Sequence, residues 1–280
     1  MIYLDYNSTT PIDPKVLQSM EPYFNEMYGN AASTTHELGR LSKNAVDNAR
    51  TIIANSINAK SHELVFTSGA TESINLGIIG SSIASTKNNK KIITTHIEHK
   101  AVLDSCKFVK EFGVETVLID VDVNGLINLD QLNDALDENV ILVIVQHVNN
   151  EVGSIQPIPE IGSICQNLGI PLMVDAAQSL GKLMIDVKKW GITYLAGSSH
   201  KIYGPKGVGI FYRDSSKKYE LSPMIYGGGH ENGMRSGTLN VPCIAGFGKA
   251  IDLAQEQMLE ESERLKTLGD LFINTLKKEK

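Results

Sequence analysis

The sequence predicts an α/β protein built on a mostly parallel mixed sheet with helices on both faces, and two observations support this prediction. Short apolar segments alternate along the chain with longer segments whose apolar residues recur at helical spacing. Strands that alternate with helices form parallel sheets, because each crossover returns the chain to the same edge. With 280 residues, 42% of them hydrophobic, the chain can bury a large core against such a sheet.

Seven apolar segments are expected to form the strands of this sheet. The run at 139–145 is apolar at every position after Asn139, as expected for a strand that is buried on both faces. The segments at 192–196 and 208–212 flank a loop rich in glycine. The expected strands are 64–66, 91–94, 115–121, 139–145, 171–175, 192–196 and 208–212.

Helices are expected where apolar residues recur every three or four positions. The first begins at Pro14 with Asp13 as its N-cap, since an aspartate followed by proline is a typical helix start. The last begins at Val241 and continues to Leu276. The helices expected between these two include residues 36–53, 74–79, 101–112 and 159–168.

Composition and charge exclude several classes of protein. The formal net charge is −6 and no basic run is present, so no nucleic-acid partner is expected. No apolar stretch reaches the roughly 18 residues of a membrane-spanning helix, and the first residues lack the features of a signal or transit peptide. Three widely spaced cysteines form neither a disulfide framework nor a zinc motif. We therefore expect a cytoplasmic enzyme without a membrane partner.

Two patterns are similar to metal sites, but we expect no metal at either. His96 and His99 stand three residues apart, and no third ligand lies near them in the sequence. The segment 120–131 matches the start of a calcium-binding loop, yet its twelfth position is Gln131 instead of glutamate. An Asn-Gly pair within it, at 124–125, is better explained as a turn.

Chemically useful side chains follow the predicted strands. The segment 67–73 leads from a strand through small residues into a helix, which either presents free N–H groups to an anion or forms an ordinary capped turn. Asp175 ends one strand, and Lys201 follows another. Because the carboxyl ends of parallel strands share one edge, these groups are expected to converge there with the imidazole of His99. An aromatic aldehyde phosphate cofactor needs such a phosphate cradle, acid and lysine.

The motifs at these positions resemble those of the cysteine desulfurases, which are pyridoxal phosphate-dependent enzymes of the class-V aminotransferase family. The resemblance extends in family order over nearly the whole chain, and it implies the large domain of the aspartate aminotransferase-like fold. The Arg-Ser-Gly-Thr motif resembles the branch that serves iron–sulfur cluster assembly. The motifs lie at 3–11, 67–73, 96–99, 147–153, 174–178, 198–209, 227–230 and 235–238.

The resemblance implies a role for each matching residue. Lys201 would hold pyridoxal 5'-phosphate covalently and, once released by the substrate, would take the proton from the substrate Cα. Asp175 would pair with the pyridinium nitrogen, and Gln178 would hydrogen-bond the phenolic oxygen. His99 would stack on the ring and help to move protons. Asn150 would lie near the substrate carboxylate and the cofactor oxygen.

The resemblance also implies how the phosphate is bound and what partners the protein has. Thr238 would reach the phosphate of the partner subunit, which implies a homodimer. The implied reaction converts L-cysteine into L-alanine and passes the sulfur to an enzyme persulfide, with a sulfur-acceptor or scaffold protein as a further partner. Within one subunit, the residues implied to bind the phosphate are Ala70, Thr71, Ser198 and His200.

The mobile cysteine of the family has no counterpart among the three cysteines of this sequence. In the family it lies in a loop after the Arg-Ser-Gly-Thr motif, where none of Cys106, Cys165 and Cys243 stands. We therefore expect a fragment or a truncated product that does not complete the desulfurase cycle alone. The alternatives are a non-catalytic cofactor-binding, scaffold or dimerisation protein, or another class-V aminotransferase.

The resemblance implies two domains, one of them incomplete. Residues 1–12 would be an N-terminal segment of the small domain, 13–255 the large cofactor-binding domain, and 256–280 the start of the small C-terminal domain. The apolar side chains of the last helix would then lack part of their cover, and the chain is expected to associate. These side chains are Leu265, Leu268, Phe272 and Leu276.

Overall fold

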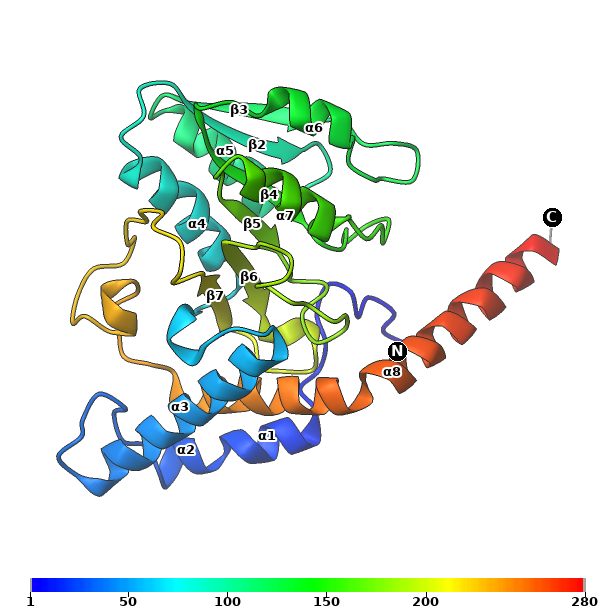
Figure 1. Ribbon diagram of the computed structural model, residues 1–280. Coiled ribbons are helices and arrows are strands. Elements are labelled where there is room, and N and C mark those ends of the chain that lie inside the picture. The colour runs from blue at the N-terminus through cyan, green and yellow to red at the C-terminus, as the bar shows by residue number, and fades with distance from the viewer. Residues whose placement is uncertain (1, 279–280) are drawn as a thin grey trace.

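A single seven-stranded sheet lies at the centre of the computed structural model, which describes residues 2–278 (Figure 1). The order across the sheet is β1-β7-β6-β5-β4-β2-β3. Strands from β6 to β3 pair in parallel, whereas β7 is antiparallel to both β1 and β6. This confirms the mostly parallel mixed sheet. The strands are β1 (Leu64–Thr67), β2 (Lys90–Thr95), β3 (Val114–Ile119), β4 (Val140–Gln146), β5 (Leu172–Asp175), β6 (Tyr194–Ser198) and β7 (Gly209–Arg213).

Helices cover both faces of the sheet, as the sequence predicts. Alternate residues of β4 belong to two separate apolar clusters, because successive side chains of a strand point to opposite faces. Leu142 and Ile144 pack with residues of α4 and α5, while Val143 and Val145 pack with residues of α3, α7 and α8. The helices are α1 (Pro14–Met20), α2 (Pro22–Asn25), α3 (Glu37–Ser56), α4 (Ala70–Ala84), α5 (Lys100–Lys110), α6 (Leu129–Ala135), α7 (Ile158–Asn167) and α8 (Val241–Lys278).

Local differences from the sequence prediction have identifiable causes. The first helix is interrupted between α1 and α2 at Pro22, which has no N–H to donate to the preceding turn. The strand expected to reach Val121 ends at Ile119, because the chain turns back so that Val121 pairs with Ile127 in an isolated bridge. Helix α6 was not predicted, although Leu129, Leu132 and Leu136 recur at helical spacing and Asn128 caps its start.

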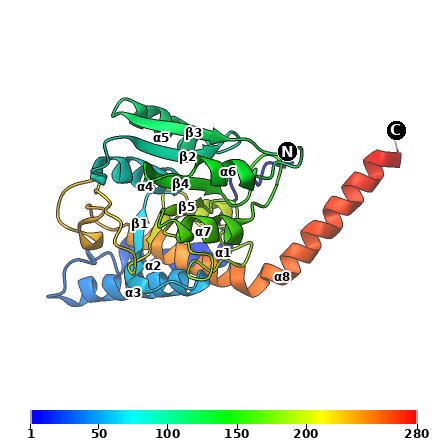
Figure 2. The same cartoon turned by 45° about the horizontal axis from the view of Figure 1, so that its top comes forward.

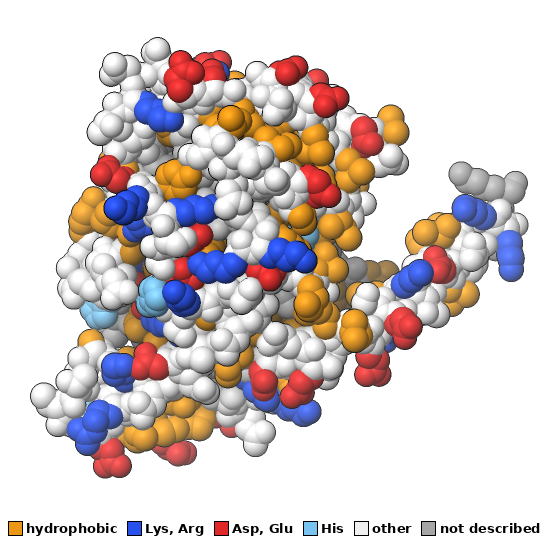
Figure 3. Space-filling view, viewed as in Figure 1, with side chains coloured by type: hydrophobic (Ala, Val, Ile, Leu, Met, Phe, Trp, Pro, Cys, Tyr) orange, Lys and Arg blue, Asp and Glu red, His pale blue; other side chains and the backbone are white. Residues whose placement is uncertain are grey.

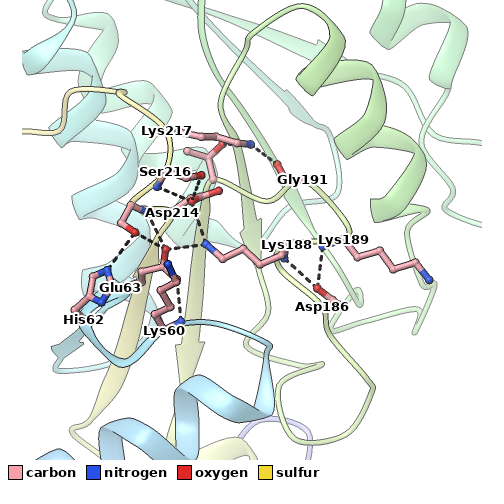
Figure 4. A network of polar contacts seen from close by, with 12 residues as sticks. Lys60, His62, Glu63, Asp186, Lys188, Lys189, Gly191, Asp214, Ser216 and Lys217 are labelled. Atoms are coloured by element: carbon pink, nitrogen blue, oxygen red, sulfur yellow. Dashed lines mark hydrogen bonds and ion pairs between the residues drawn. The ribbon is translucent and has the colours of Figure 1, made fainter.

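A network of ion pairs joins the start of β1 to the end of β7 (Figure 4). Lys188 Nζ lies 2.7 Å from Glu63 Oε1 and 3.1 Å from Asp214 Oδ1. Burial opposes ionisation of Glu63, but hydrogen bonds from Lys188, Lys60 and Ser215 outweigh it and lower the pKa of this carboxyl to about 2. One lysine therefore pairs with two nearly buried carboxylates, at the opposite end of the sheet from the carboxyl ends of its parallel strands.

The last helix, α8, has two halves in different surroundings. Its first half packs against α1 and α3, whereas its second half projects away from the body of the molecule (Figures 1 and 2). Apolar side chains alternate with charged ones along the projecting half (Figure 3). The four side chains expected to lack cover are 48–66% exposed: Leu265, Leu268, Phe272 and Leu276.

No helix in residues 2–278 is both long and apolar enough to cross a membrane. The boundary at 255–256 stays a prediction, although it falls near the point where α8 leaves the body (Figure 1). Residue 1 of the expected N-terminal segment and residues 279–280 of the expected small domain lie outside the described residues.

We predict that Lys188→Met lowers the free energy of unfolding by about 2–4 kcal/mol, since it leaves two buried carboxylates without their cation. The stabilisation of ionised Glu63 is complete above its unfolded pKa of about 4.5 and is lost as the pH falls towards 2. Urea unfolding should therefore show a smaller loss at pH 3 than at pH 7. Lys189→Met, at the exposed neighbouring lysine, is the control. Equal losses at both pH values would contradict this account.

We also predict that the projecting half of α8 binds a hydrophobic dye and promotes association of the chain, because its apolar side chains are exposed together. Leu268→Lys with Phe272→Lys should lower both dye fluorescence and the sedimentation coefficient at high protein concentration. Thr267→Lys adds charge to the same helix without removing apolar surface and serves as the control. A wild-type chain that binds little dye would refute the prediction.

Candidate active site

A cavity of about 420 Å³ opens at the carboxyl ends of the parallel strands. The register places Gln146, Asp175 and Ala196 side by side on β4, β5 and β6, so the polar residues that follow meet at one edge. Nine predicted site residues line this cavity: Ala70, Thr71, His99, Asn150, Asp175, Gln178, Ser198, His200 and Lys201. The structure thus brings together residues that are up to 131 positions apart, whatever their roles.

The N-terminus of α4 forms one wall of the cavity. The helix begins at Ala70, directly after Gly69. Gly69 has a φ of +154°, a conformation that residues with a side chain rarely adopt. No side chain caps the first N–H groups of the helix. Gly209 of the neighbouring strand lets the backbones approach, because a Cβ there would lie 2.6 Å from Gly69 Cα. Free N–H groups and the helix dipole favour an anion at this position.

Asp175 lies buried at the end of β5, on the floor of the cavity. Among the described residues, the only hydrogen bond to its carboxylate comes from Ala177 N at 2.9 Å. Burial raises the pKa of Asp175, while the nearby charges of His99 and Lys201 act in the opposite direction. A buried carboxylate with so few donors is stabilised by a cationic group placed against it.

Lys201 is held by the N-terminal segment, for which the sequence suggested no role in the site. Its Nζ donates to the carbonyls of Asn7 and Ser8, both at 2.7 Å. Partial burial lowers the pKa of Lys201, and the carboxylates of Asp175 and Asp5 limit that effect. A lowered pKa makes the neutral, nucleophilic amine easier to form. The motif at 3–11, part of the family resemblance, is the sequence signal for this contact.

Three further residues of the predicted set are held by hydrogen bonds to neighbouring residues. Gln178 Nε2 donates to the carbonyl of Asn7 at 3.0 Å. His200 Nδ1 lies 3.0 Å from Thr9 Oγ1, and burial lowers the pKa of this imidazole. Asn150 Oδ1 accepts from Gln146 Nε2 at 3.3 Å, so its amide lies at the rim beside the end of β4.

His99 is exposed on the cavity wall and caps helix α5. Its Nδ1 accepts from Ala101 N at 3.0 Å, so the ring proton of the neutral imidazole is on Nε2. The cap holds the ring at the end of β2. His96 instead lies 3.5 Å from Asp120 and outside the cavity.

Glu98 is a buried acid that sequence reasoning missed, although it stands directly before His99. Its two oxygens accept from Thr95 Oγ1 at 2.7 Å and from Gln146 N at 2.8 Å. Burial raises its pKa to about 8, Thr95 and Gln146 N oppose this effect, and the charge of Asp175 adds to it. Glu98 is therefore mainly neutral near pH 7, which avoids a second negative charge beside Asp175.

Thr238 does not line the cavity. It is exposed at the end of a loop that two ion pairs attach to the body, Arg50 with Glu231 and Arg235 with Glu72. Glu72 also accepts from Ser68 N, just before α4. The loop is thus attached close to the N-terminus of α4. A contact of Thr238 with a partner subunit stays a prediction.

The cysteines and the suspected metal ligands do not form further reactive sites. Burial raises the pKa of Cys106 and Cys165 to about 12 and also raises that of Cys243. No group of three or more potential metal ligands occurs within residues 2–278. Asp122 accepts from the backbone of its own loop, as expected for the turn at 124–125.

Comparison with known proteins identifies the family. The model of the class-V aminotransferases matches residues 2–277. Cysteine desulfurase IscS of Rickettsia massiliae (strain Mtu5) is 44% identical over 279 residues, which cover 99% of this chain and 68% of the relative. The corresponding protein of Serratia proteamaculans (strain 568) is 47% identical over 278 residues, with 99% and 69% covered. The chain belongs to the cysteine desulfurases.

Solved structures agree with this family. A NifS-like protein superposes with a TM-score of 0.94 at 37% identity, covering 98% of this chain and 75% of that one. SspA in complex with cysteine superposes with a TM-score of 0.87 at 40% identity, covering 90% and 72%. Cysteine desulfurases depend on pyridoxal phosphate, and this chain is shorter than its curated relatives.

The residues of the cavity fit this cofactor. The uncapped N-terminus of α4 suits its phosphate, and buried Asp175, with one neutral donor, suits a protonated ring nitrogen. Lys201 supplies an amine with a lowered pKa for the aldehyde. The cavity of about 420 Å³ has the size of a small-molecule site.

We predict that Glu98→Gln makes stability less dependent on pH. In the wild type Glu98 stays protonated up to about pH 8 when folded but ionises near 4.5 when unfolded, so stability falls as the pH rises between these values. The amide keeps the shape of the side chain and cannot ionise, so the slope should decrease by up to ~1.4 kcal/mol per pH unit. Urea unfolding from pH 5 to 8 tests this, with exposed Glu115→Gln as the control. An unchanged slope would show that Glu98 is ionised when folded.

Proposed function

We propose that this chain carries the pyridoxal phosphate-dependent site of a cysteine desulfurase, which converts L-cysteine into L-alanine and transfers the sulfur to a thiol. The observation that supports this most directly is the convergence of Lys201, buried Asp175 and the N-terminus of α4 on one cavity in a chain of this family. A solved relative, SspA, was obtained in complex with cysteine, and this supports cysteine as the substrate.

The residues of the chain have distinct tasks in this proposal. The N–H groups at the start of α4, with Ser198 and His200, bind the phosphate. Asp175 holds a proton on the ring nitrogen, because the pair of opposite charges relieves its own burial. When bound, the cofactor supplies an electron sink that stabilises negative charge on the substrate.

Lys201 and Gln178 act on the side of the cavity that faces the N-terminal segment. The amine of Lys201 would hold the cofactor aldehyde and serve as the base for the Cα proton of cysteine. Gln178 would donate to the phenolic oxygen, and Asn150 would orient the substrate carboxylate. His99 lines the cavity, where its ring would face the cofactor and its Nε2 would exchange a proton with the substrate.

The sulfur acceptor is a thiolate that attacks the substrate sulfur and becomes a persulfide while the remaining three carbons leave as alanine. None of the three cysteines suits this step, because each has a raised pKa. We infer that the thiol comes from outside these 280 residues. The accompanying proposals are a cytoplasmic homodimer, with Thr238 at the partner's phosphate, and delivery of sulfur to an acceptor or scaffold protein for iron–sulfur clusters.

The raised pKa of all three thiols also favours a second candidate, a protein that binds the cofactor and dimerises without turnover. Alanine formation separates the two. The first candidate requires alanine when cysteine is supplied with a reducing thiol, and the second requires none under the same conditions. Production of alanine with less cysteine than protein and no added thiol, so that neither a second cysteine nor a reductant accepts the sulfur, would contradict the inferred external acceptor.

We predict that the purified chain mixed with pyridoxal phosphate develops a long-wavelength absorption band that borohydride removes. Lys201→Ala should abolish the band, because the amine that bonds to the aldehyde is lost. Lys206→Ala, at an exposed lysine in the same loop, should retain it. Absence of the band from the wild type, or its persistence in Lys201→Ala, would refute the assignment of the site.

A further inference from the structure

Lys182 is a partly buried lysine near the cavity that has no role in the chemistry described above. It lies with Asn7, Asn150 and Gln178 in a second hollow of about 370 Å³ beside the cofactor cavity. Gln178 lines both hollows, as do Asn7, Asn150 and Glu151, so the two hollows are neighbours. Burial lowers the pKa of Lys182, and the charge of Lys201 adds to this effect, so the two lysines lie within electrostatic reach of one another.

The amide of Gln178 has partners of opposite polarity at its two ends. Lys182 Nζ donates to Oε1 at 3.3 Å, and Nε2 donates to the carbonyl of Asn7 at 3.0 Å. That carbonyl also accepts from Lys201 Nζ. An ammonium group only donates, so the end of the amide that faces Lys182 must be the oxygen. The N–H end consequently faces the side on which Lys201 lies.

The position of Lys182 is set by a tight turn between β5 and the loop that follows. Lys182 N donates to the carbonyl of Ser179. Ser179 lies four residues after Asp175, where β5 ends. Gly181 adopts a φ of +73°, and a Cβ at this glycine would lie 3.2 Å from side-chain atoms of Ile202 and Ala254. Packing against these two residues therefore holds the turn, and with it the lysine.

We propose that Lys182 is a positioning residue that orients the amide of Gln178, so that its N–H end and not its oxygen faces Lys201 and the cofactor. This rests on the proposed function, which places the electron-rich phenolic oxygen of pyridoxal phosphate there. An amide is nearly the same shape in both orientations, so shape alone does not select one. In the rotated amide, Nε2 would face the ammonium of Lys182, which offers no acceptor, and Oε1 would face the carbonyl of Asn7, which offers no donor. Lys182 and Asn7 therefore select the same orientation from the two ends of the amide, and removal of Lys182 withdraws one of these two constraints.

The first test compares pyridoxal phosphate binding by the wild type, Lys182→Met and Lys182→Arg. Lys182→Met should weaken binding about tenfold, the expected effect of one hydrogen bond to a charged group, and should shift the absorption maximum of the bound form. Arginine also only donates, so Lys182→Arg should restore both properties. Lys189→Met, which removes an exposed lysine, is the matched control. Thermal unfolding of each variant reports whether it folds.

A double-mutant cycle with Gln178→Ala tests whether Lys182 acts through Gln178. If it does, Lys182→Met should have no further effect on binding or on the spectrum in the Gln178→Ala background. Effects that multiply in the double variant would overturn the proposal, because Lys182 would then act on the cofactor directly or on the fold. Equal binding and spectra for Lys182→Met and the wild type would overturn it as well.

A measurement on the cofactor-free protein separates this proposal from the proposed function. The side-chain NH₂ signals of Gln178, followed by NMR, should shift and broaden in Lys182→Met and return in Lys182→Arg. Unchanged signals would overturn the orienting role even if the cofactor binds. Conversely, a wild type that forms no Lys201-dependent absorption band would refute the proposed function, while the amide signals would still decide whether Lys182 orients Gln178.

Discussion

Burial of Asp175 at the end of β5 is the constraint on which the site depends. A carboxylate in apolar surroundings is costly unless a cation or several donors compensate for the lost water. Within residues 2–278, Ala177 N is its single hydrogen-bond donor, and Glu98 beside it has a pKa raised to about 8. The floor of the cavity thus holds a buried carboxyl group with one donor, next to an acid that is mainly neutral near pH 7. In the proposed function, a protonated ring nitrogen would supply the missing cation.

The N-terminal segment supplies the other half of the electrostatic balance. Carbonyls of Asn7 and Ser8 hold the amine of Lys201, while Asp5 and Asp175 limit the depression of its pKa. Neutral carbonyls orient the amine without adding a charge that would strongly favour its protonated form. The carbonyl of Asn7 also accepts from Gln178 Nε2, so this short segment contacts both Lys201 and Gln178.

Much of the fold follows from local sequence patterns. The apolar run at 139–145 became β4, buried on both faces, and Asp13 caps the helix that begins at Pro14, as predicted. The prediction missed α6, whose apolar period extends over only seven residues, and it was wrong where Pro22 interrupted a helical pattern. β3 ends before Val121 because Val121 pairs with Ile127 in an isolated bridge, and not because its residues have a low strand propensity.

The sequence alone placed Asp175 and Lys201 at strand ends, and the parallel order of the strands then required them to meet at one edge. It could not show that Asn7 bonds to Lys201, 194 positions away, or that Glu98 lies beside Asp175. Lys182 is only four residues from Gln178, but its contact with the Gln178 amide and its partial burial are evident only in the folded structure. Local patterns specify backbone conformation over a few residues, whereas these contacts depend on register and packing between distant segments, which exist only once the chain has folded.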